Sequence, residues 1–263
     1  MNNKTFKGSN DFEHLIKLIN SVPQKQSTLL IGIDGCGGSG KSTLASKLKS
    51  KLLNTTVVHM DDFYLPSSQL LKTLPKNKPV GADYDWRRVL NQVLEPVAQN
   101  KEGHYQRYDW VRDILAEWHT VPVGGIVIIE GVYTMRQEFF EKYDFTIWVE
   151  CPRDTRLSRG IERDGETARD MWENNWMLSE DVYVETYRPF ERADLIVVVL
   201  NKYSIELKGR VTIPFPFVSI LEISPLLFEV EFEIESQSRD WLFSRFLSVP
   251  VFLLKITCNL QLI

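Results

Sequence analysis

Short runs of apolar residues alternate along the chain with segments whose apolar residues recur at helical spacing. The apolar runs occupy residues 28–34, 57–59, 126–129, 145–149 and 195–200. Because these runs have no polar face, each is expected to form a strand that is buried on both sides of a sheet. The alternation predicts an α/β fold, in which a parallel sheet of about five strands has helices on both faces. The carboxyl ends of the strands would meet at one edge, where such proteins bind ligands.

Between and before these strands the pattern predicts helices and two irregular segments. Helices are expected over about residues 10–22, 43–53, 86–98 and 153–187. Asn10 and Glu13 can cap the first of them. Residues 65–81, which contain several prolines and lysines, are expected to form a surface excursion. The aromatic-rich residues 103–122 are expected to form a small hairpin.

The residues after 202 differ in character from the rest. No glycine follows Gly209, and residues 228–235 alternate strictly between apolar and acidic side chains, as a strand with two unlike faces would. We therefore divide the chain into a domain over residues 1–202 and an extension over residues 203–263. The extension is either β-rich and packed on the domain, a dimer contact, poorly ordered, or a sequence that is not adapted to this fold.

Composition and charge narrow the class of protein. The 263 residues are 43% hydrophobic and 25% charged, with a formal net charge of -4 and a pI of about 5.7. This is the balance of an ordinary globular protein, and its acidity argues against nucleic acid as the main partner. Three cysteines without paired spacing favour a reducing, cytoplasmic location. No signal peptide and no apolar run of about eighteen residues is found, so we expect no membrane segment.

A glycine-rich loop joins the first apolar run to the helix that follows. Residues 35–42 read GCGGSGKS, which matches the Walker A pattern G-x-x-x-x-G-K-[ST] of P-loop NTPases. The backbone amides of such a loop surround a polyphosphate, Lys41 reaches the terminal phosphates, and the Ser42 hydroxyl binds Mg²⁺. The alternative is a glycine turn with a structural role only. The residues expected to bind the nucleotide are Gly35, Cys36, Gly37, Gly38, Ser39, Gly40, Lys41, Ser42 and Thr43.

Two acidic residues follow strands that should end beside this loop. Asp61 comes just after residues 57–59, and Glu130 closes residues 126–129 like a Walker B element with Glu in place of Asp. Glu130 could hold Mg²⁺ directly or through water, while Asp61 could orient or deprotonate an acceptor hydroxyl and approach the metal. The alternative for each acid is a cap on the next turn. Asp62 is the neighbour most easily confused with Asp61.

A row of arginines shares one face of the helix expected after residue 152. The row consists of Arg156, Arg159 and Arg163, spaced at i, i+3 and i+7. Guanidinium groups can bind phosphate oxygens in pairs, which suits a lid over about residues 153–170 that closes on the transferring phosphates. Gly160 and Gly165 would help this lid to hinge. The alternative is a solvated face whose arginines pair with nearby acids.

Aromatic residues are concentrated in two stretches of the chain. They are Tyr64, Tyr84, Trp86, Tyr105, Tyr108, Trp110 and Trp118. They could form a stacking pocket for a flat ring, or they could pack the core and its rim. None of the four histidines has a metal-binding spacing, so we assign them no role.

Together these motifs resemble the uridine kinase and phosphoribulokinase family of P-loop small-molecule kinases. The resemblance spans about residues 27–201. It rests on GCGGSGKST at 35–43, DDFY at 61–64, the strand with Glu-Gly at 126–131 and DTRLSRGIERD at 154–164. The first motif is shared by the whole superfamily, whereas the second and fourth are specific to this family.

Carried over residue by residue, the resemblance implies chemical roles. Asp61 would be the base that accepts the proton of the acceptor hydroxyl. The ligands of Mg²⁺ would be Ser42, Asp61 and Glu130. The lid residues that contact the phosphates of ATP would be Arg156, Arg159 and Arg163. The catalytic side chains would then be Asp61, Lys41 and Arg159.

The acceptor side contains one departure from the family pattern. Residues 84–86 resemble the family's Phe-Asp-His segment, which makes Asp85 a candidate for binding ribose hydroxyls. Residues 108–110 resemble its Tyr-Asp-Phe segment, which makes Tyr108 a candidate for stacking on a base. Five residues further on, uridine kinases have a base-reading histidine and this chain has Asp113, which predicts a change of substrate. The residues expected to bind the acceptor are Asp61, Tyr64, Tyr84, Asp85, Tyr108 and Arg156.

The sequence thus predicts a kinase that uses ATP and Mg²⁺ to phosphorylate a hydroxyl of a nucleoside or nucleoside-like small molecule. One alternative is a kinase for another small alcohol, such as a sugar, a vitamin or a pantothenate-like acceptor. Asp113 favours that alternative, whereas Tyr108 favours a nucleoside. A third hypothesis is a nucleotide-binding switch or assembly ATPase whose partner binds the C-terminal extension. A homo-oligomer is compatible with each of the three.

Overall fold

The computed structural model describes residues 6–7, 10–199 and 205–209. These residues belong to one compact unit. Apart from residues 205–209, the predictions for the C-terminal extension, including the alternating segment 228–235, lie outside the described residues. Among the described helices, none has both the length and the apolar character that are needed to cross a membrane.

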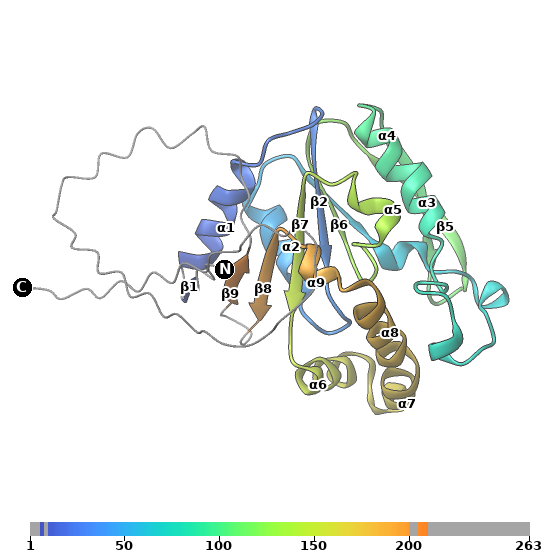
Figure 1. The fold of residues 1–263 in the computed structure, drawn as a ribbon. Coiled ribbons are helices and arrows are strands. Elements are labelled where there is room, and N and C mark those ends of the chain that lie inside the picture. Colours follow the sequence, from blue (N-terminus) through green and yellow to red (C-terminus); the bar gives the residue numbers. More distant parts are fainter. Residues whose placement is uncertain (1–5, 8–9, 200–204, 210–263) are drawn as a thin grey trace, which may run out of the picture. The chain divides into compact units, whose positions relative to one another are not determined.

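A seven-stranded sheet lies at the centre of this unit (Figure 1). Its strands are ordered β1-β9-β8-β7-β2-β6-β3. They span Phe6–Lys7 (β1), Thr28–Asp34 (β2), Thr55–His59 (β3), Gly125–Glu130 (β6), Phe145–Glu150 (β7), Leu195–Val199 (β8) and Ile205–Gly209 (β9). Strands β3, β6, β2, β7 and β8 run parallel, which confirms the predicted five-stranded parallel sheet and its α/β class. Strands β9 and β1 extend the sheet by antiparallel pairing beside β8. β9 lies in the extension, for which a β-rich segment packed on the domain was one of the predicted alternatives, whereas β1 was not predicted.

Helices cover both faces of the sheet. They span Asn10–Asn20 (α1), Lys41–Lys51 (α2), Trp86–Val89 (α3), Glu95–Ala98 (α4), Gln137–Phe140 (α5), Arg153–Asp164 (α6), Arg169–Met171 (α7), Met177–Tyr187 (α8) and Pro189–Arg192 (α9). Two π-helical turns, Leu90–Leu94 and Trp172–Trp176, make α3–α4 and α7–α8 continuous. The helix predicted over residues 153–187 is interrupted at Gly165, whose φ of 89° a residue with a side chain rarely adopts.

The alternating side chains of β2 explain why both faces must be covered. Leu29, Ile31 and Ile33 pack on one face with α1 and α2, whereas Leu30 packs on the other with α3, α4 and α5. Each of these four side chains is almost completely buried. Burying a side chain of this size stabilises the fold by about 1.5–3 kcal/mol. The central strand is therefore fixed in place, and the loop that follows it starts from a rigid support.

The predicted hairpin over residues 103–122 is confirmed as a separate two-stranded sheet. Strands β4 (Gly103–Asp109) and β5 (Ile114–Val121) pair antiparallel, with an irregularity in the register between Gln106 and Tyr108. Tyr105 stacks on Phe63 with ring centroids 4.8 Å apart, which attaches the hairpin to the short 3-10 turn Met60–Phe63 that follows β3.

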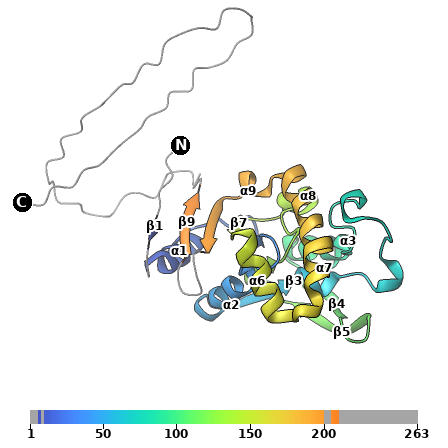
Figure 2. The same ribbon diagram turned by 90° about the horizontal axis from the view of Figure 1, so that it is seen from below.

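The carboxyl ends of three strands meet at one edge of the sheet. Ile33 of β2 lies opposite Glu130 of β6, and Glu130 in turn lies opposite His59 of β3. Helices α6, α7 and α8 lie beyond this edge in both views (Figure 1, Figure 2). The polar residues at the strand ends and those on these helices can therefore face one another.

Candidate active site

The glycine-rich loop runs from the end of β2 to the start of α2. Gly38 has a φ of 74°, and a Cβ atom there would lie 2.5 Å from the backbone oxygen of Arg156. Gly40, directly before α2, has a φ of 105°. A side chain at either position would be strained, so the loop requires glycine there. Within the loop, Lys41 Nζ donates a hydrogen bond to the Cys36 carbonyl at 3.0 Å.

A buried aspartate that was not predicted from the sequence holds the start of the loop through hydrogen bonds. Asp34 accepts hydrogen bonds from the backbone N–H groups of Gly35 and Met135, each at 2.6 Å, and from the Tyr183 hydroxyl at 2.7 Å. Complete burial raises the pKa of Asp34 to about 6, although these hydrogen bonds oppose the shift. Asp34 thereby joins the start of the loop to α8. Its position at the end of a predicted buried strand was the only signal for it in the sequence.

The two predicted acids lie beside the loop. Glu130 is 4% exposed at the end of β6. Burial alone would raise the pKa of Glu130, but hydrogen bonds with His59 and Ser42 and the charges of Lys41 and His59 outweigh burial and lower it. Asp61 lies on the wall of the adjacent cavity. The Asp61 side chain is exposed to the cavity, but desolvation by the protein around it and then the negative charge of Glu130 raise its pKa.

His59 takes part in this site, although no role was assigned to it from the sequence. Its Nδ1 lies 2.5 Å from Oε1 of Glu130. This hydrogen bond raises the pKa of His59, and partial burial opposes the increase. Both residues end neighbouring parallel strands and lie opposite each other in the register. That pairing could have been found from sequence only if the strand order had been known.

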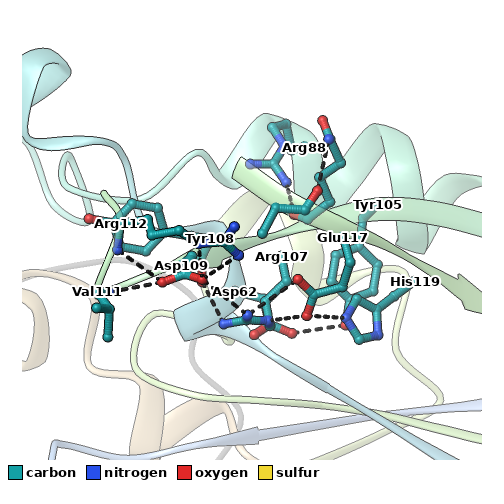
Figure 3. Close-up of polar contacts among 12 residues, drawn as sticks. Asp62, Arg88, Tyr105, Arg107, Tyr108, Asp109, Val111, Arg112, Glu117 and His119 are labelled. Carbon is teal, nitrogen blue, oxygen red and sulfur yellow. Dashed lines mark hydrogen bonds and ion pairs between the residues drawn. The ribbon is translucent and has the colours of Figure 1, made fainter. Parts of the chain in front are cut away.

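The structure separates Asp61 from its neighbour Asp62. The Asp62 carboxylate accepts a hydrogen bond from the Tyr105 hydroxyl at 2.9 Å and so faces the hairpin (Figure 3). Asp61 instead faces the cavity, where the Tyr84 hydroxyl donates to it at 3.4 Å. Figure 3 also shows that the charges of the hairpin pair with one another, as Arg107 does with Glu117 at 2.6 Å.

The three arginines of the lid have different partners. Arg159 lines the cavity, and its Nη1 donates to the carbonyl oxygens of Gly38 and Ser39 at 3.2 and 3.4 Å. Arg163 also lines the cavity, but it is 67% exposed and forms an ion pair with Asp164 at 2.7 Å. Arg156 does not line the cavity, because it is buried in an ion pair with Glu180.

One cavity of about 620 Å³ is lined by residues of the glycine-rich loop, the two predicted acids and two of the three lid arginines. Gly38, Lys41, Ser42, Asp61 and Glu130 line it together with an aromatic wall. The wall consists of Tyr64, Tyr84, Trp110, Tyr133, Trp172 and Trp176. The sequence singled out the first three of these, and it gave no signal that separated the last three from core aromatics.

Besides Arg156, two other residues expected to bind the acceptor, Tyr108 and Asp85, do not line this cavity. Tyr108 is 4% exposed, and its hydroxyl donates to Asp113 Oδ1 at 2.6 Å. Asp85 caps α3 by accepting a hydrogen bond from the Arg88 N–H at 3.3 Å. Asp113 also accepts hydrogen bonds from the backbone N–H of Ser67, at 2.8 Å, and from its hydroxyl. Asp113 thus joins the hairpin to the 65–81 excursion and does not face the cavity.

The groups around Lys41 are suited to anions and hard cations. The Ser39 hydroxyl, buried inside the loop, has no hydrogen-bond partner in the described part of the protein. The Ser42 hydroxyl is hydrogen-bonded with Glu130, so two oxygen atoms lie together at the start of α2. No group of three or more His, Cys, Asp or Glu side chains with metal-binding geometry is found among the described residues. A site with few protein oxygens still fits Mg²⁺, which keeps several waters and binds phosphates.

The order of β2, glycine loop and α2 on this parallel sheet defines the P-loop class of nucleotide-binding proteins. Within that class, the model of the Phosphoribulokinase / Uridine kinase family matches residues 30–206, which is more than half of the 263 residues. The chain belongs to this family. It is therefore a phosphotransferase whose acceptor group is an alcohol, and the resemblance inferred from its motifs is confirmed.

Individual relatives agree with this assignment. The chain is 28% identical to a uridine kinase of Mycoplasma pneumoniae over 67% of its own length and 88% of the relative's. It is 29% identical to a uridine kinase of Ureaplasma parvum over 68% and 91% of the two lengths. A solved structure described as a possible uridine kinase from Bacillus stearothermophilus is similar in fold, with a TM-score of 0.57 and 24% identity. That similarity covers 71% of this chain and 97% of the other.

Proposed function

We propose that this chain is a kinase that uses ATP and Mg²⁺ to phosphorylate a hydroxyl group of a nucleoside or nucleoside-like small molecule. One observation carries the proposal: the phosphate loop, Asp61 and an aromatic wall share a single cavity. A kinase must hold a phosphate donor and a hydroxyl acceptor in one enclosed space, because phosphoryl transfer depends mainly on positioning and charge neutralisation.

At the phosphate end, this chain would supply donors in fixed positions. The loop amides would hold the polyphosphate, Lys41 and Arg159 would neutralise its charge, and Ser42 and Glu130 would hold Mg²⁺. Asp61 could approach the same ion, and Arg163 lies at the cavity wall as a further phosphate contact. ATP and Mg²⁺ would supply the transferable phosphoryl group and the counter-charge for it. The lowered pKa of Glu130 supports this scheme, because a metal ligand must be ionised.

At the acceptor end, Asp61 would remove the proton of the attacking hydroxyl. Its raised pKa makes the carboxylate a stronger base than an ordinary aspartate. The positive charges of Lys41, Arg163 and His59 lower the pKa and so reduce this increase. Tyr64 and Tyr84 would contact the acceptor from the aromatic wall.

The identity of the acceptor rests on two opposing observations. The uridine kinases that resemble this chain and the aromatic wall both favour a nucleoside. Asp113 favours the second candidate, a kinase for another small alcohol, because it stands in place of a base-reading histidine and is bonded to Tyr108 and Ser67. An acceptor that is recognised by the residues of the aromatic wall, and not by Asp113, would agree with both observations.

A panel of nucleosides, sugars, vitamins and other small alcohols, incubated with ATP and Mg²⁺ and scored by ADP release above background, tests the proposal. In the presence of the best acceptor, Asp61→Asn should lower kcat by at least about a hundredfold and leave the affinity for ATP nearly unchanged. Asp62→Asn is the matched control, because it removes the same charge one residue away from a side chain that faces the hairpin. An Asp61→Asn variant that keeps most of its kcat would show that the base is assigned incorrectly.

We further propose that the protein works in the cytoplasm. Cys36 and Cys151, the two cysteines among the described residues, are both buried and free, which suits a reducing compartment. Light scattering of the purified protein would test whether it forms a homo-oligomer.

A further inference from the structure

Glu180, on α8, places a carboxylate directly on the phosphate loop. Its Oε1 accepts a hydrogen bond from the Gly37 N–H at 2.8 Å, and its Oε2 accepts one from Arg156 Nη1 at 3.0 Å. The side chains of Glu180 and Arg156 are only 5% and 8% exposed. Glu180 and Gly37 line the same cavity as Lys41. The carboxylate is therefore part of the surface on which a polyphosphate would bind.

The donors that hold Glu180 are the kind of groups that bind phosphate. Successive N–H groups of a P-loop bind anions, and a guanidinium binds phosphate oxygens as readily as it binds a carboxylate. An N–H directed at Glu180 is not directed at a phosphate, and two anions at such close range in a cavity repel each other. The carboxylate and a nucleotide phosphate therefore compete for the same groups.

We propose that the Glu180 carboxylate competes with the nucleotide for the phosphate loop. Glu180 occupies the Gly37 N–H and Arg156 until a nucleoside triphosphate displaces the carboxylate. This inference rests on the proposed function, because it assumes that the loop binds ATP. It also explains why Arg156 is paired with Glu180, although the family resemblance implies a phosphate contact for it. Displacement of Glu180 would release Arg156 for the phosphates.

The surroundings of Glu180 provide an internal reporter of this exchange. A Cβ atom on Gly37 would lie 2.8 Å from Glu180 Oε1 and 3.0 Å from Cζ3 of Trp172. The Trp172 ring therefore lies against the same point of the loop as the carboxylate. Movement of α8 that withdraws Glu180 should change the fluorescence of Trp172.

The first test is nucleotide binding by Glu180→Gln, which removes the charge but keeps the size of the side chain and an acceptor for the Gly37 N–H. Titration followed by tryptophan fluorescence and calorimetry should show a Kd for ATP that is about tenfold lower than in the wild type. The gain should be smaller for ADP, which has fewer charges. Asp181→Asn is the matched control, because Asp181 is the next residue of α8 and pairs with Arg153. Its Kd for ATP should equal that of the wild type.

Unchanged or weaker ATP binding by a folded Glu180→Gln variant would overturn the proposal, because it would show that Glu180 only supports the structure of the loop.

The second test uses the wild type and so does not depend on the folding of a variant. In a crystal structure with a non-hydrolysable ATP analogue and Mg²⁺, Glu180 Oε1 should lie more than about 3.5 Å from the Gly37 nitrogen, beyond hydrogen-bond range. A hydrogen bond that persists beside the bound analogue would also overturn it.

These two tests separate the inference from the proposed function. Both measure nucleotide binding and need no acceptor. A wild type that binds no ATP would overturn the inference and the proposed function together. A wild type that phosphorylates an acceptor, with unchanged ATP binding in Glu180→Gln, would overturn the inference alone.

Discussion

Gly160 offers a sharp test of how the lid packs on the phosphate site. It lies in the interior of α6, and its missing side chain leaves room for the ring of Trp172. The sequence suggested that Gly160 helps a lid to hinge, whereas the structure gives it a packing contact. Gly160→Ala changes only this contact, since it adds a single methyl group.

The magnitude of the effect follows from the distances. An alanine Cβ atom would lie 2.4, 2.6 and 2.7 Å from Cε2, Cζ2 and Cδ2 of Trp172. Carbon atoms that are not bonded prefer about 3.5–4.0 Å, so either α6 or the ring has to move. The ring is 2% exposed, and its Nε1 donates to Asp164 at 2.9 Å, which opposes movement. Overpacking of this kind costs about 1–3 kcal/mol.

Helix propensity acts in the opposite direction, which makes the sign of the result decisive. Replacing glycine by alanine inside a helix normally stabilises it by about 1 kcal/mol. Contacts as short as 2.4 Å place the overpacking cost at its upper end, about 2–3 kcal/mol, so we expect a net loss of about 1–2 kcal/mol in the free energy of unfolding. For a domain of this size, that loss lowers the Tm by about 2–8 °C.

Thermal and urea unfolding, followed by circular dichroism and tryptophan fluorescence, measure this change. Ser158→Ala is the control, because Ser158 is exposed on the same helix and its replacement should alter the free energy of unfolding by less than about 0.5 kcal/mol. A Gly160→Ala variant as stable as the wild type, or more stable, would refute the packing argument. The lid would then have enough freedom to hinge at this position.

Substitutions at two further sites test the support of the aromatic wall by Asp113 and the pairing of His59 with Glu130 at the strand ends. Tyr108 packs on Tyr64 and Trp110 of the aromatic wall, with ring centroids 5.8 and 5.1 Å apart. Asp113→Gly tolerates the φ of 56° at position 113 but removes the hydrogen bonds to Tyr108 and Ser67, so it should raise the KM for the acceptor several-fold without changing the KM for ATP. Asp113→Asn should restore most of the loss, and an equal effect on both KM values would contradict this role. The hydrogen bond with Glu130 raises the pKa of His59 above its usual 6.5. Protonated His59 therefore contributes its full stabilisation of the fold below pH 6.5, and this stabilisation is lost as the pH rises through the raised pKa. His59→Gln should therefore reduce the fall in Tm between about pH 6 and pH 9, and a fall as steep as in the wild type would show that another group causes it.

The sequence determined the fold class and the position of the phosphate loop, because both depend on local patterns. Apolar runs such as residues 126–129 can only be buried strands in this context, and a P-loop requires glycine at fixed spacing. The acids at strand ends followed from the same logic. Parallel strands align their carboxyl ends, so Asp61 and Glu130 had to lie near Lys41.

Only the tertiary structure decided which side chains complete the site. Glu180 lies 143 residues from Gly37, and His59 lies 71 residues from Glu130, so no local spacing could indicate either contact. The direction of a side chain at a turn was equally hidden, because Asp113 could have faced the cavity or, as it does, Ser67 and Tyr108. Strand and loop formation depend on neighbours in the chain, whereas hydrogen-bond partners depend on which distant elements pack together. The sequence therefore specified the phosphate loop, and the packing of α6, α7 and α8 specified which side chains contact this loop.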